Sequence, residues 1–436
     1  MNWQAILLLC VGTLLVLMSA GIPVAFAFFT LNLALTYLLF GAEGIYQLIL
    51  NVLDSVGKFV LVPIPMFVLM GEVLSRSGLA GRALAAVSLC LGAIPGRLAV
   101  LSLVGGAVFA AASGSALANT SMLARMLIPE MRKHGYSKLM SAGPVLAAGT
   151  LAMVIPPSAM AVLVGAVGGI PIGKLLVAGV IPGLIIALAA IAYVMILCSI
   201  RPDLAPAYEV ELPPWRDRLY RVARDVFPIA LLVFLVLGLI FAGVATPSES
   251  AALGALGAVI LWFANGTLTL NELARALLAT VRVTASILLI LAGAASYSYL
   301  LAFTGATHGF VEAVLSLALA PLAVIAAMQI IVLLLGTALD QISILLITMP
   351  IFKPVVEALG FDLVWFGILM LINLDLANLT PPFGLTLYVL KTAAPSDFTM
   401  GEITRSALPF VVLDIGVIAL VMTFPQLATW LPAQLR

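Results

Sequence analysis

Charged residues are scarce in this chain: Asp, Glu, Lys and Arg make up 9% of its 436 residues, while 64% are apolar. A soluble domain needs far more charge to cover its surface, so the composition excludes a water-soluble globular protein. Apolar runs of about twenty residues, the length that crosses roughly 30 Å of hydrocarbon, recur along the chain. The short alternating segments of a β-barrel are missing. The sequence therefore predicts an all-α polytopic membrane protein.

Cysteine and histidine are rarer still, with three and two residues. The cysteines lie in apolar stretches without a pairing pattern, which predicts buried hydrophobic side chains rather than disulfides. Two histidines exclude a histidine-rich metal site. A net charge of +1 without basic blocks argues against a nucleic-acid partner. The sequence also lacks a P-loop, a His-Glu-x-x-His motif and a Ser/His/Asp set at membrane depth, so we expect no enzyme, no catalytic residue and no cofactor.

Ten apolar segments predict membrane crossings. The first is interpreted as a helix rather than a signal peptide, because the first basic residue is Lys58. The predicted crossings are about 4–21, 23–40, 59–76, 138–168, 179–200, 226–244, 247–265, 283–303, 362–390 and 408–430. Three amphipathic stretches, 42–57, 79–95 and 267–282, are expected to lie along the membrane interface.

Two further apolar segments, about 98–133 and 320–358, are interrupted at mid-length by small and polar residues. Each is long enough to enter the membrane and return, so each predicts a re-entrant helical hairpin. Two of the crossings contain consecutive prolines, at 155–158 and 379–383. Paired prolines remove two backbone donors, so the helix must unwind there. Such breaks are tolerated at membrane depth only where protein or water satisfies the freed backbone groups.

Landmarks of the first half recur in the second half in the same order. Gly71 precedes Gly114 by the same number of residues as Gly293 precedes Gly336. Three pairs of proline landmarks are related by nearly the same offset. Five landmarks in one order favour an internal repeat over chance alignment in a chain rich in glycine and proline.

Each half then holds five crossings and one hairpin. Five is odd, so the second half is predicted to be inverted, as in secondary transporters. The predicted division is a first inverted repeat at 1–200, a cytoplasmic linker at 201–225 and a second inverted repeat at 226–436. With both termini in the periplasm, 16 of the 20 Lys and Arg residues face the cytoplasm. We therefore expect a multi-pass protein of a bacterial inner membrane, in contact with lipid.

Hairpin tips and broken helices that meet near the midplane predict sites for ions and substrate. Helix N-termini suit a carboxylate, and unwound carbonyl groups suit Na⁺. The first predicted sodium site comprises Ser113, Gly114, Ser115, Asn119, Ile155 and Pro156. The second comprises Gly336, Thr337, Asp340, Thr380 and Pro381. The predicted substrate-binding residues are Ser115, Asn119, Thr120, Ser158, Asp340 and Thr380.

The alternative is that Gly and Ser only let helices approach and that Pro marks ordinary kinks. The pairing of a polar break with a double proline in both halves disfavours it. A charge at bilayer depth is costly, so Asp340 is expected to serve an ion or the substrate. For Asp375 the sequence leaves two interpretations open: a role in ion or substrate binding, or a purely structural pairing with a local donor. Glu72 is expected to form a local ion pair with Arg76.

At this level of detail the chain resembles the large membrane subunit of TRAP (tripartite ATP-independent periplasmic) transporters over nearly its full length. The matching segments are Gly21–Phe26, Gly71-Glu72 with Arg76–Leu79, Ala112–Ala116, Ile155–Ser158, Ala178–Gly183, Thr246–Glu249 and Leu379–Pro382. The resemblance implies an elevator-type, Na⁺-coupled uptake system. It also implies two partners, a periplasmic substrate-binding protein and a small four-helix membrane subunit. The implied substrates are small organic acids: C4-dicarboxylates, sialic and other sugar acids, or keto acids.

Two other transport mechanisms compete with this interpretation. A single-component sodium–carboxylate symporter of the divalent-anion type shares the hairpins but needs no partner. A channel is disfavoured, because re-entrant tips from opposite sides favour alternating closure over a continuous pore. The lack of an ATPase motif means that transport must be driven by an ion gradient.

Overall fold

The computed structural model describes residues 2–208 and 213–435, apart from the side chains of residues 111–113. Within this part of the chain every regular element is helical. The predicted all-α fold class is confirmed.

The first half of the chain folds into ten α-helices. They are α1 (Trp3–Ser19), α2 (Val24–Val56), α3 (Pro63–Arg76), α4 (Leu79–Cys90), α5 (Arg97–Ser113), α6 (Ala116–Lys133), α7 (Lys138–Thr150), α8 (Ala159–Gly168), α9 (Ile172–Ala178) and α10 (Val180–Ile200). Two single 3₁₀ turns are interspersed, η1 (Phe59–Leu61) before α3 and η2 (Leu151–Met153) after α7. The predicted interruptions at 113–115 and 155–158 therefore separate α5 from α6 and α7 from α8.

The second half follows the linker elements η3 (Pro202–Leu204) and α11 (Trp215–Asp225). Its helices are α12 (Phe227–Phe241), α13 (Pro247–Ala264), α14 (Leu270–Phe303), α15 (Ala306–Ser316), α16 (Pro321–Gly336), α17 (Gln341–Ala358), α18 (Leu363–Leu379), α19 (Leu385–Ala393), α20 (Met400–Thr423) and α21 (Gln426–Thr429), followed by η4 (Pro432–Gln434). Here α16 and α17 flank the second predicted hairpin tip, and α18 and α19 flank the second proline pair. The inverted relation between the halves stays a prediction.

Seven helices in the described part of the chain are long and apolar enough to span a membrane, or eight if the bent pair α11 and α12 counts as one span. Six of the seven coincide with predicted crossings. The seventh is α17, which belongs to the second predicted hairpin. Of the four remaining predicted crossings, the first corresponds to α1, which has only 17 residues, two are divided by the paired prolines, and 226–244 corresponds to α12 of the bent pair.

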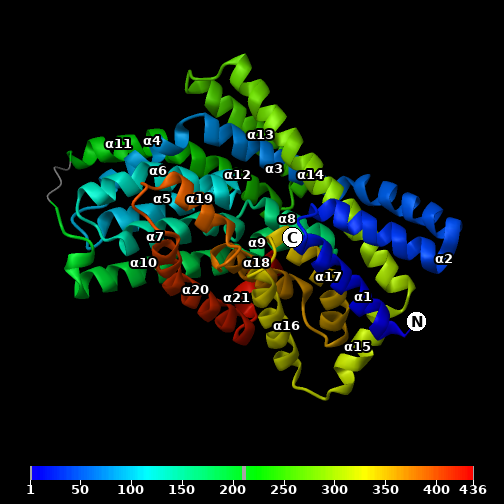
Figure 1. Ribbon diagram of the computed structural model, residues 1–436. Coiled ribbons are helices and arrows are strands. Elements are labelled where there is room, and N and C mark those ends of the chain that lie inside the picture. The colour runs from blue at the N-terminus through cyan, green and yellow to red at the C-terminus, as the bar shows by residue number, and fades with distance from the viewer. Residues whose placement is uncertain (1, 209–212, 436) are drawn as a thin grey trace.

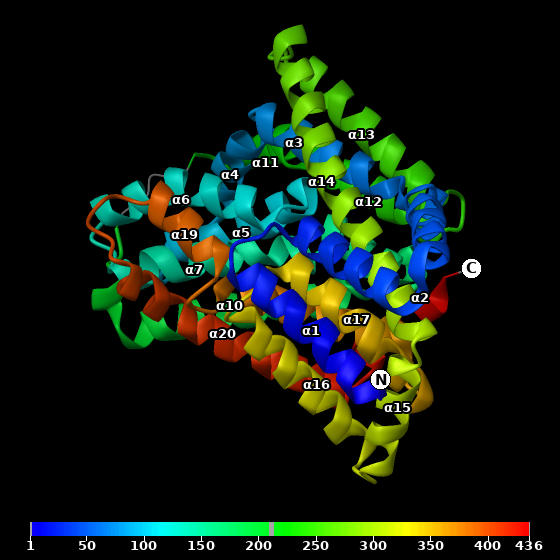
Figure 2. The ribbon, with the colours of Figure 1, turned by 45° about the vertical axis from the view of Figure 1, so that its right-hand side comes forward.

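The two longest helices, α2 and α14, pack against each other at the periphery. They contain 33 and 34 residues, or about 50 Å of helix, which exceeds the hydrocarbon thickness. In Figures 1 and 2 the joined ends of α13 and α14 project from the body. The segment 267–282 is thus no separate interfacial helix as expected, since its helical part continues directly into the crossing. Segment 42–57 likewise continues α2, with a kink at Gly41 (φ 63°).

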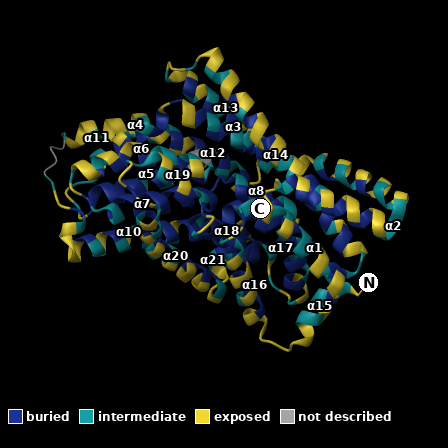
Figure 3. Cartoon of the chain, viewed as in Figure 1, coloured by how far each residue is buried: buried dark blue, intermediate teal, exposed yellow. Residues whose placement is uncertain are grey.

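The two broken helices form the centre of the molecule. Every residue of α18 from Val364 to Leu379 is buried, and so is every residue of α7 from Met140 to Thr150. Both hairpin arms of the first half pack against α7, and both arms of the second half pack against α18. Figure 3 shows the resulting buried interior, with exposed residues concentrated on the outer helices. Protein therefore surrounds the first unwound segment, whereas Pro382 and Phe383 of the second are exposed.

Candidate functional site

The tip of the first hairpin touches the first proline break. Gly114 ends α5 in the left-handed conformation (φ 57°), which favours glycine. A β-carbon added to Gly114 would lie 3.4 Å from the Pro157 carbonyl oxygen and 3.6 Å from the Ala159 nitrogen. Ser113 belongs to the predicted site, but its side chain lies outside the described residues.

Two helix N-termini meet at this contact, and serine caps both. Ser115 accepts the Ala118 N–H at 3.4 Å at the start of α6, and Ser158 accepts the Ala161 N–H at 3.2 Å at the start of α8. Neither cap carries a charge, so the partial positive charge of both helix ends is retained. The geometry favours an anion near the tip.

Asn119 and Thr120 lie one turn further along α6 and are fully buried. The Asn119 amide group donates to the carbonyl oxygens of Gly106 (3.1 Å) and Ala148 (2.8 Å), which joins the hairpin to α7. Its side-chain oxygen and the Thr120 hydroxyl find no hydrogen-bond partner among the described residues. Two buried oxygen acceptors without a donor suit a cation.

The first break is the unwound segment between η2 and α8. The Pro156–Pro157 peptide bond is cis, and neither proline can donate to the carbonyls of Ala152 and Met153. Ile155, predicted as a sodium ligand, packs with its side chain against α10, where a β-carbon on Gly183 would lie 2.8 Å from it. Only its backbone carbonyl is therefore suited to the predicted role.

The second tip differs from the first because its cap is charged. The Asp340 carboxylate accepts the Ile342 N–H at 3.1 Å, the Ser343 N–H at 3.4 Å and the Ser343 hydroxyl. The Thr337 hydroxyl donates to Leu334 O at 2.7 Å. On the other side of the tip, Gly336 packs closely on Ala377 of α18, since an added β-carbon would lie 2.8 Å from the Ala377 β-carbon.

The second break is tied to the second tip through Asn378. Its amide group donates to the Gln341 side-chain oxygen at 2.6 Å and also contacts the Met153 sulfur at 3.4 Å. Thr380, the predicted sodium ligand, donates its hydroxyl to Leu376 O at 2.8 Å. The Pro381–Pro382 bond is cis, as in the first break. Asn378 therefore connects the second hairpin, the second break and the end of the first broken helix.

Both tips open onto one cavity of about 220 Å³. Its walls include residues 114–118 of the first tip, Gln341 and Ile342 of the second, and Met153 and Ala159 beside the first break. Two larger cavities, each of about 670 Å³, lie between α2 and α14 and beside α12, and neither is lined by a tip. The small cavity brings the predicted residues Gly114 and Ser115 of the first tip together with Gln341 and Ile342, which directly follow the predicted residue Asp340.

The opposite wall of the cavity comes from α3 and α14. Glu72 of α3 lines it and pairs with Arg76 at 3.1 Å, as predicted, and Arg76 also reaches Glu272 at 3.5 Å. Sequence reasoning recognised the ion pair but not that Glu72 faces the tips. No periodicity in the sequence indicates which helix covers a hairpin, so this contact was not predictable.

The structure thus assembles part of the predicted set. Gly114 and Ser115 line the cavity, and Asp340 directly precedes cavity-lining Gln341. Asn119, Thr120 and Ser158 are fully buried behind the first tip. The prediction gave Gln341 no role, although its position beside Asp340 was a usable signal.

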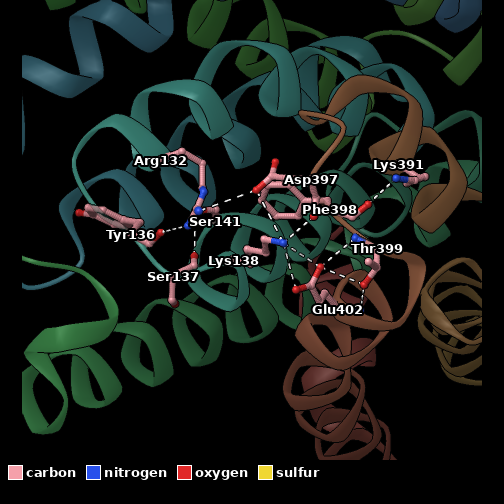
Figure 4. A network of polar contacts seen from close by, with 10 residues as sticks. All are labelled: Arg132, Tyr136, Ser137, Lys138, Ser141, Lys391, Asp397, Phe398, Thr399 and Glu402. Carbon is pink, nitrogen blue, oxygen red and sulfur yellow. Dashed lines mark hydrogen bonds and ion pairs between the residues drawn. The ribbon is translucent and has the colours of Figure 1, made fainter.

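A polar cluster joins the two halves at the N-terminal end of α7, away from the proline break. We call it the inter-half clamp (Figure 4). It consists of Arg132, Lys138, Asp397 and Glu402. Lys138 lies 3.1 Å from Glu402 and 3.6 Å from Asp397, while Arg132 lies 3.8 Å from Asp397. Beside it, burial raises the pKa of Tyr136 to about 12, so the phenol stays protonated. The clamp fixes the start of α7 to the start of α20.

Comparisons with known proteins agree with this arrangement. Residues 11–427 match the family described as "Tripartite ATP-independent periplasmic transporter, DctM component". The C4-dicarboxylate TRAP transporter large permease protein DctM of Pseudomonas aeruginosa is 31% identical over 92% of both chains. The sialic acid TRAP transporter large permease protein SiaM of Vibrio cholerae is 31% identical over 95% of this chain and 96% of its own. The ectoine permease TeaC of Halomonas elongata is 28% identical over 97% of both chains.

Solved structures support the fold alone. The YdaH transporter of Alcanivorax borkumensis superposes with a TM-score of 0.65 at 14% identity, covering 94% of this chain and 98% of its own. MtrF of Neisseria gonorrhoeae gives a TM-score of 0.62 at 15% identity, with 88% and 85% covered. The family match spans nearly the whole sequence, and its relatives are permeases rather than enzymes. The chain therefore belongs to the DctM family of large permease subunits of TRAP transporters.

Proposed function

We propose that this permease takes up a small organic acid across the inner membrane, driven by an inward Na⁺ gradient. The observation that carries the proposal is the single cavity shared by both hairpin tips and the first break. Relatives named for C4-dicarboxylate and sialic acid support an acid as the substrate. A volume of about 220 Å³ suits a small metabolite, since it lies below the range of drug-sized pockets.

The substrate carboxylate is proposed to bind at the first tip. The N-termini of α6 and α8 converge there, and both caps are neutral serines, so donor N–H groups and helix dipoles favour negative charge. Ser115, Ser158 and the neighbouring backbone form this subsite, with Thr120 behind it. At the second tip Asp340 already supplies a carboxylate, which disfavours a second anion there and favours a cation.

Two Na⁺ sites are proposed beside the tips. The first uses Ser115, the unpartnered Asn119 oxygen and the backbone of residues 155–156. The second uses the backbone near Gly336, the oxygens of Thr337 and Asp340, and the break at Thr380. Both sets offer hydroxyl, amide, carboxylate and carbonyl oxygens, which hard cations prefer.

Transport in this proposal follows an elevator mechanism. The hairpins and broken helices, α5–α8 and α16–α19, would move against a scaffold of α2, α3, α13 and α14. A small membrane subunit would brace the scaffold, and a periplasmic binding protein would deliver the acid. Both termini would face the periplasm.

Reconstituted uptake tests the proposal. Proteoliposomes would hold both membrane subunits, with the substrate chosen by ligand screening of the binding protein. We expect uptake only with an inward Na⁺ gradient and the binding protein together. Undiminished uptake with K⁺ in place of Na⁺ would refute the sodium coupling. Uptake without the binding protein would indicate a single-component symporter instead.

A further inference from the structure

Two carboxyl groups lie in the interior of the helical core without a basic partner. Asp375 lies in the last third of α18, four residues before its end, and is fully buried; neither of its carboxyl oxygens has a hydrogen-bond partner among the described residues. Asp414 is at mid-length of α20 and 4% exposed. The two helices pack against each other, with the Trp365 N–H of α18 donating to Val421 O of α20 at 2.8 Å, and both carboxyl groups are buried in this packed interior. The site proposed above uses neither residue.

The surroundings of the pair offer no compensating charge. The other ionisable groups on the elements packed against α18 and α20 are Lys138, Lys174, Tyr193, Cys198, Lys353, Glu357, Asp362, Tyr388, Lys391, Glu402 and Arg405. In the described part of the chain none of them forms an ion pair or hydrogen bond with either aspartate. Lys138 is held by Glu402, and Lys353 lies 3.8 Å from Glu357. Thr150 of α7 is a neighbour, but its hydroxyl donates to Ala147 O at 3.1 Å.

Such a pair must bind a cation. Two carboxylates buried in one packed interior repel each other, and each is costly without a counter-ion. Binding a proton removes the charge of a buried carboxylate and with it this cost, and it requires no further ligand. A hard metal ion would need about six oxygen ligands, and the residues beside Asp375 on α18 are Leu374 and Leu376. The chemistry therefore favours H⁺ over Na⁺.

We propose that Asp375 and Asp414 form a proton-binding site whose occupancy is required for transport. Asp375 lies about one turn before Asn378, which holds the second tip through Gln341 and contacts Met153 of the first broken helix. Loss of the proton from Asp375 would place a negative charge inside α18 and disturb the packing that positions Asn378. The site is distinct from the cavity and from both proposed sodium sites.

Infrared spectroscopy of the purified permease tests proton binding without knowledge of the substrate. A protonated carboxyl group has a carbonyl stretch that is separate from that of a carboxylate and shifts in D₂O. We expect this band in the wild type at neutral pH and its loss on raising the pH. Asp375→Asn and Asp414→Asn should each reduce it, whereas Glu312→Gln, a change of an exposed carboxyl, should leave it. If neither variant alters the band, or if no such band titrates in the wild type, the proposal is wrong.

Uptake measurements then test the requirement for transport. Above the pH at which the pair ionises, wild-type uptake should fall about tenfold for each further pH unit if one proton is required. The two Asn variants keep the shape of a protonated aspartate, so uptake should persist at alkaline pH. If one variant fails to fold, the other variant and the wild-type infrared titration still decide the question. A band that is lost with rising Na⁺ at constant pH would show a sodium site and overturn the proton assignment. Failure of Na⁺ coupling would leave the infrared result untouched, so the two proposals fail separately.

Discussion

The two hairpin tips occupy corresponding places in the two halves, yet their caps carry different charge. Ser115 caps α6 with a neutral hydroxyl, whereas Asp340 caps α17 with a carboxylate. The first tip also lies against a second serine-capped helix start, at Ser158. One fold thus offers an electropositive tip for an anion and an electronegative tip for a cation. The backbone provides the tips, and the capping residue sets their preference.

The tips also differ in what supports them, and glycine substitutions would have the largest effect. A β-carbon on Gly149 would lie 1.8 Å from the Thr120 hydroxyl oxygen and 3.2 Å from the Thr120 α-carbon, and one on Gly336 would lie 2.8 Å from the Ala377 β-carbon. We expect Gly149→Ala and Gly336→Ala each to destabilise the protein by about 1–3 kcal/mol through overpacking. Thermal unfolding followed by size-exclusion chromatography would measure this.

Matched variants sharpen that test. Gly416→Ala in α20 has no neighbour within 4 Å of the added carbon and should be neutral or slightly stabilising. Ala377→Gly should rescue Gly336→Ala in part, because it removes the β-carbon across the contact but leaves the α-carbon of residue 377 at 3.0 Å. Thr120→Ala should rescue Gly149→Ala only in part, since the Thr120 backbone would still be close. If both glycine variants unfold at the same temperature as the wild type, the contacts at Gly149 and Gly336 are not closely packed.

Exchanging the charged cap tests the electrostatic contrast directly. Asn caps a helix as well as Asp or Ser, so Asp340→Asn removes the charge and keeps the cap. We expect half-saturating Na⁺ to rise about 10- to 100-fold, the cost of about 1.5–3 kcal/mol for losing a charged ligand. Ser115→Asn, a neutral exchange at the other tip, should change Na⁺ dependence far less. Equal effects of the two variants on the Na⁺ titration would remove the proposed contrast.

Deleting one neutral ligand at each tip should have a smaller effect. Ser115→Ala and Thr380→Ala each remove one hydroxyl without adding a buried charge. A lost ligand that costs about as much as a buried hydrogen bond, roughly 1–2 kcal/mol, raises half-saturating Na⁺ about tenfold. Linkage requires substrate affinity to fall with it, which uptake at varied Na⁺ and substrate would show. If both variants express well and keep their Na⁺ dependence, these hydroxyls serve packing only.

The sequence predicted the fold well because its strongest signals are local. Paired prolines force a break wherever they occur, and a small or polar interruption in a long apolar run marks a turn, so 155–158, 379–383 and both tips were located. Element length was less predictable. The segment 267–282 is amphipathic, but nothing in it stops the helix before α14 continues to Phe303. A continuous helix and two abutting ones share the same periodicity.

The site was predictable only to the extent that its residues lie at those breaks. Gly114, Ser115 and Asp340 were found because each sits at an interruption. The bridge from Asn378 to Gln341 and Met153 joins three segments far apart in the sequence, so no local pattern reveals it. Asp414 is different, because a lone acidic residue inside an apolar run is itself a functional signal. Sequence analysis considered Asp375 of α18 for this reason but gave Asp414 no role, although the same signal was present there.

The smallest expected effect concerns the inter-half clamp, which links the halves that carry the two contrasting tips. Glu402 caps α20 with Thr399 and pairs with Lys138, whereas Glu249 makes the same capping box with Thr246 and has no ion pair among the described residues. Gln preserves a capping box, so Glu402→Gln removes the ion pair while Glu249→Gln controls for the cap. We expect the melting temperature to fall by about 1–3 °C more for Glu402→Gln than for Glu249→Gln, because exposed ion pairs contribute little. High salt should reduce the difference by screening. Equal melting temperatures at low salt would mean that apolar packing between α7 and α20 alone holds the two halves together at this end.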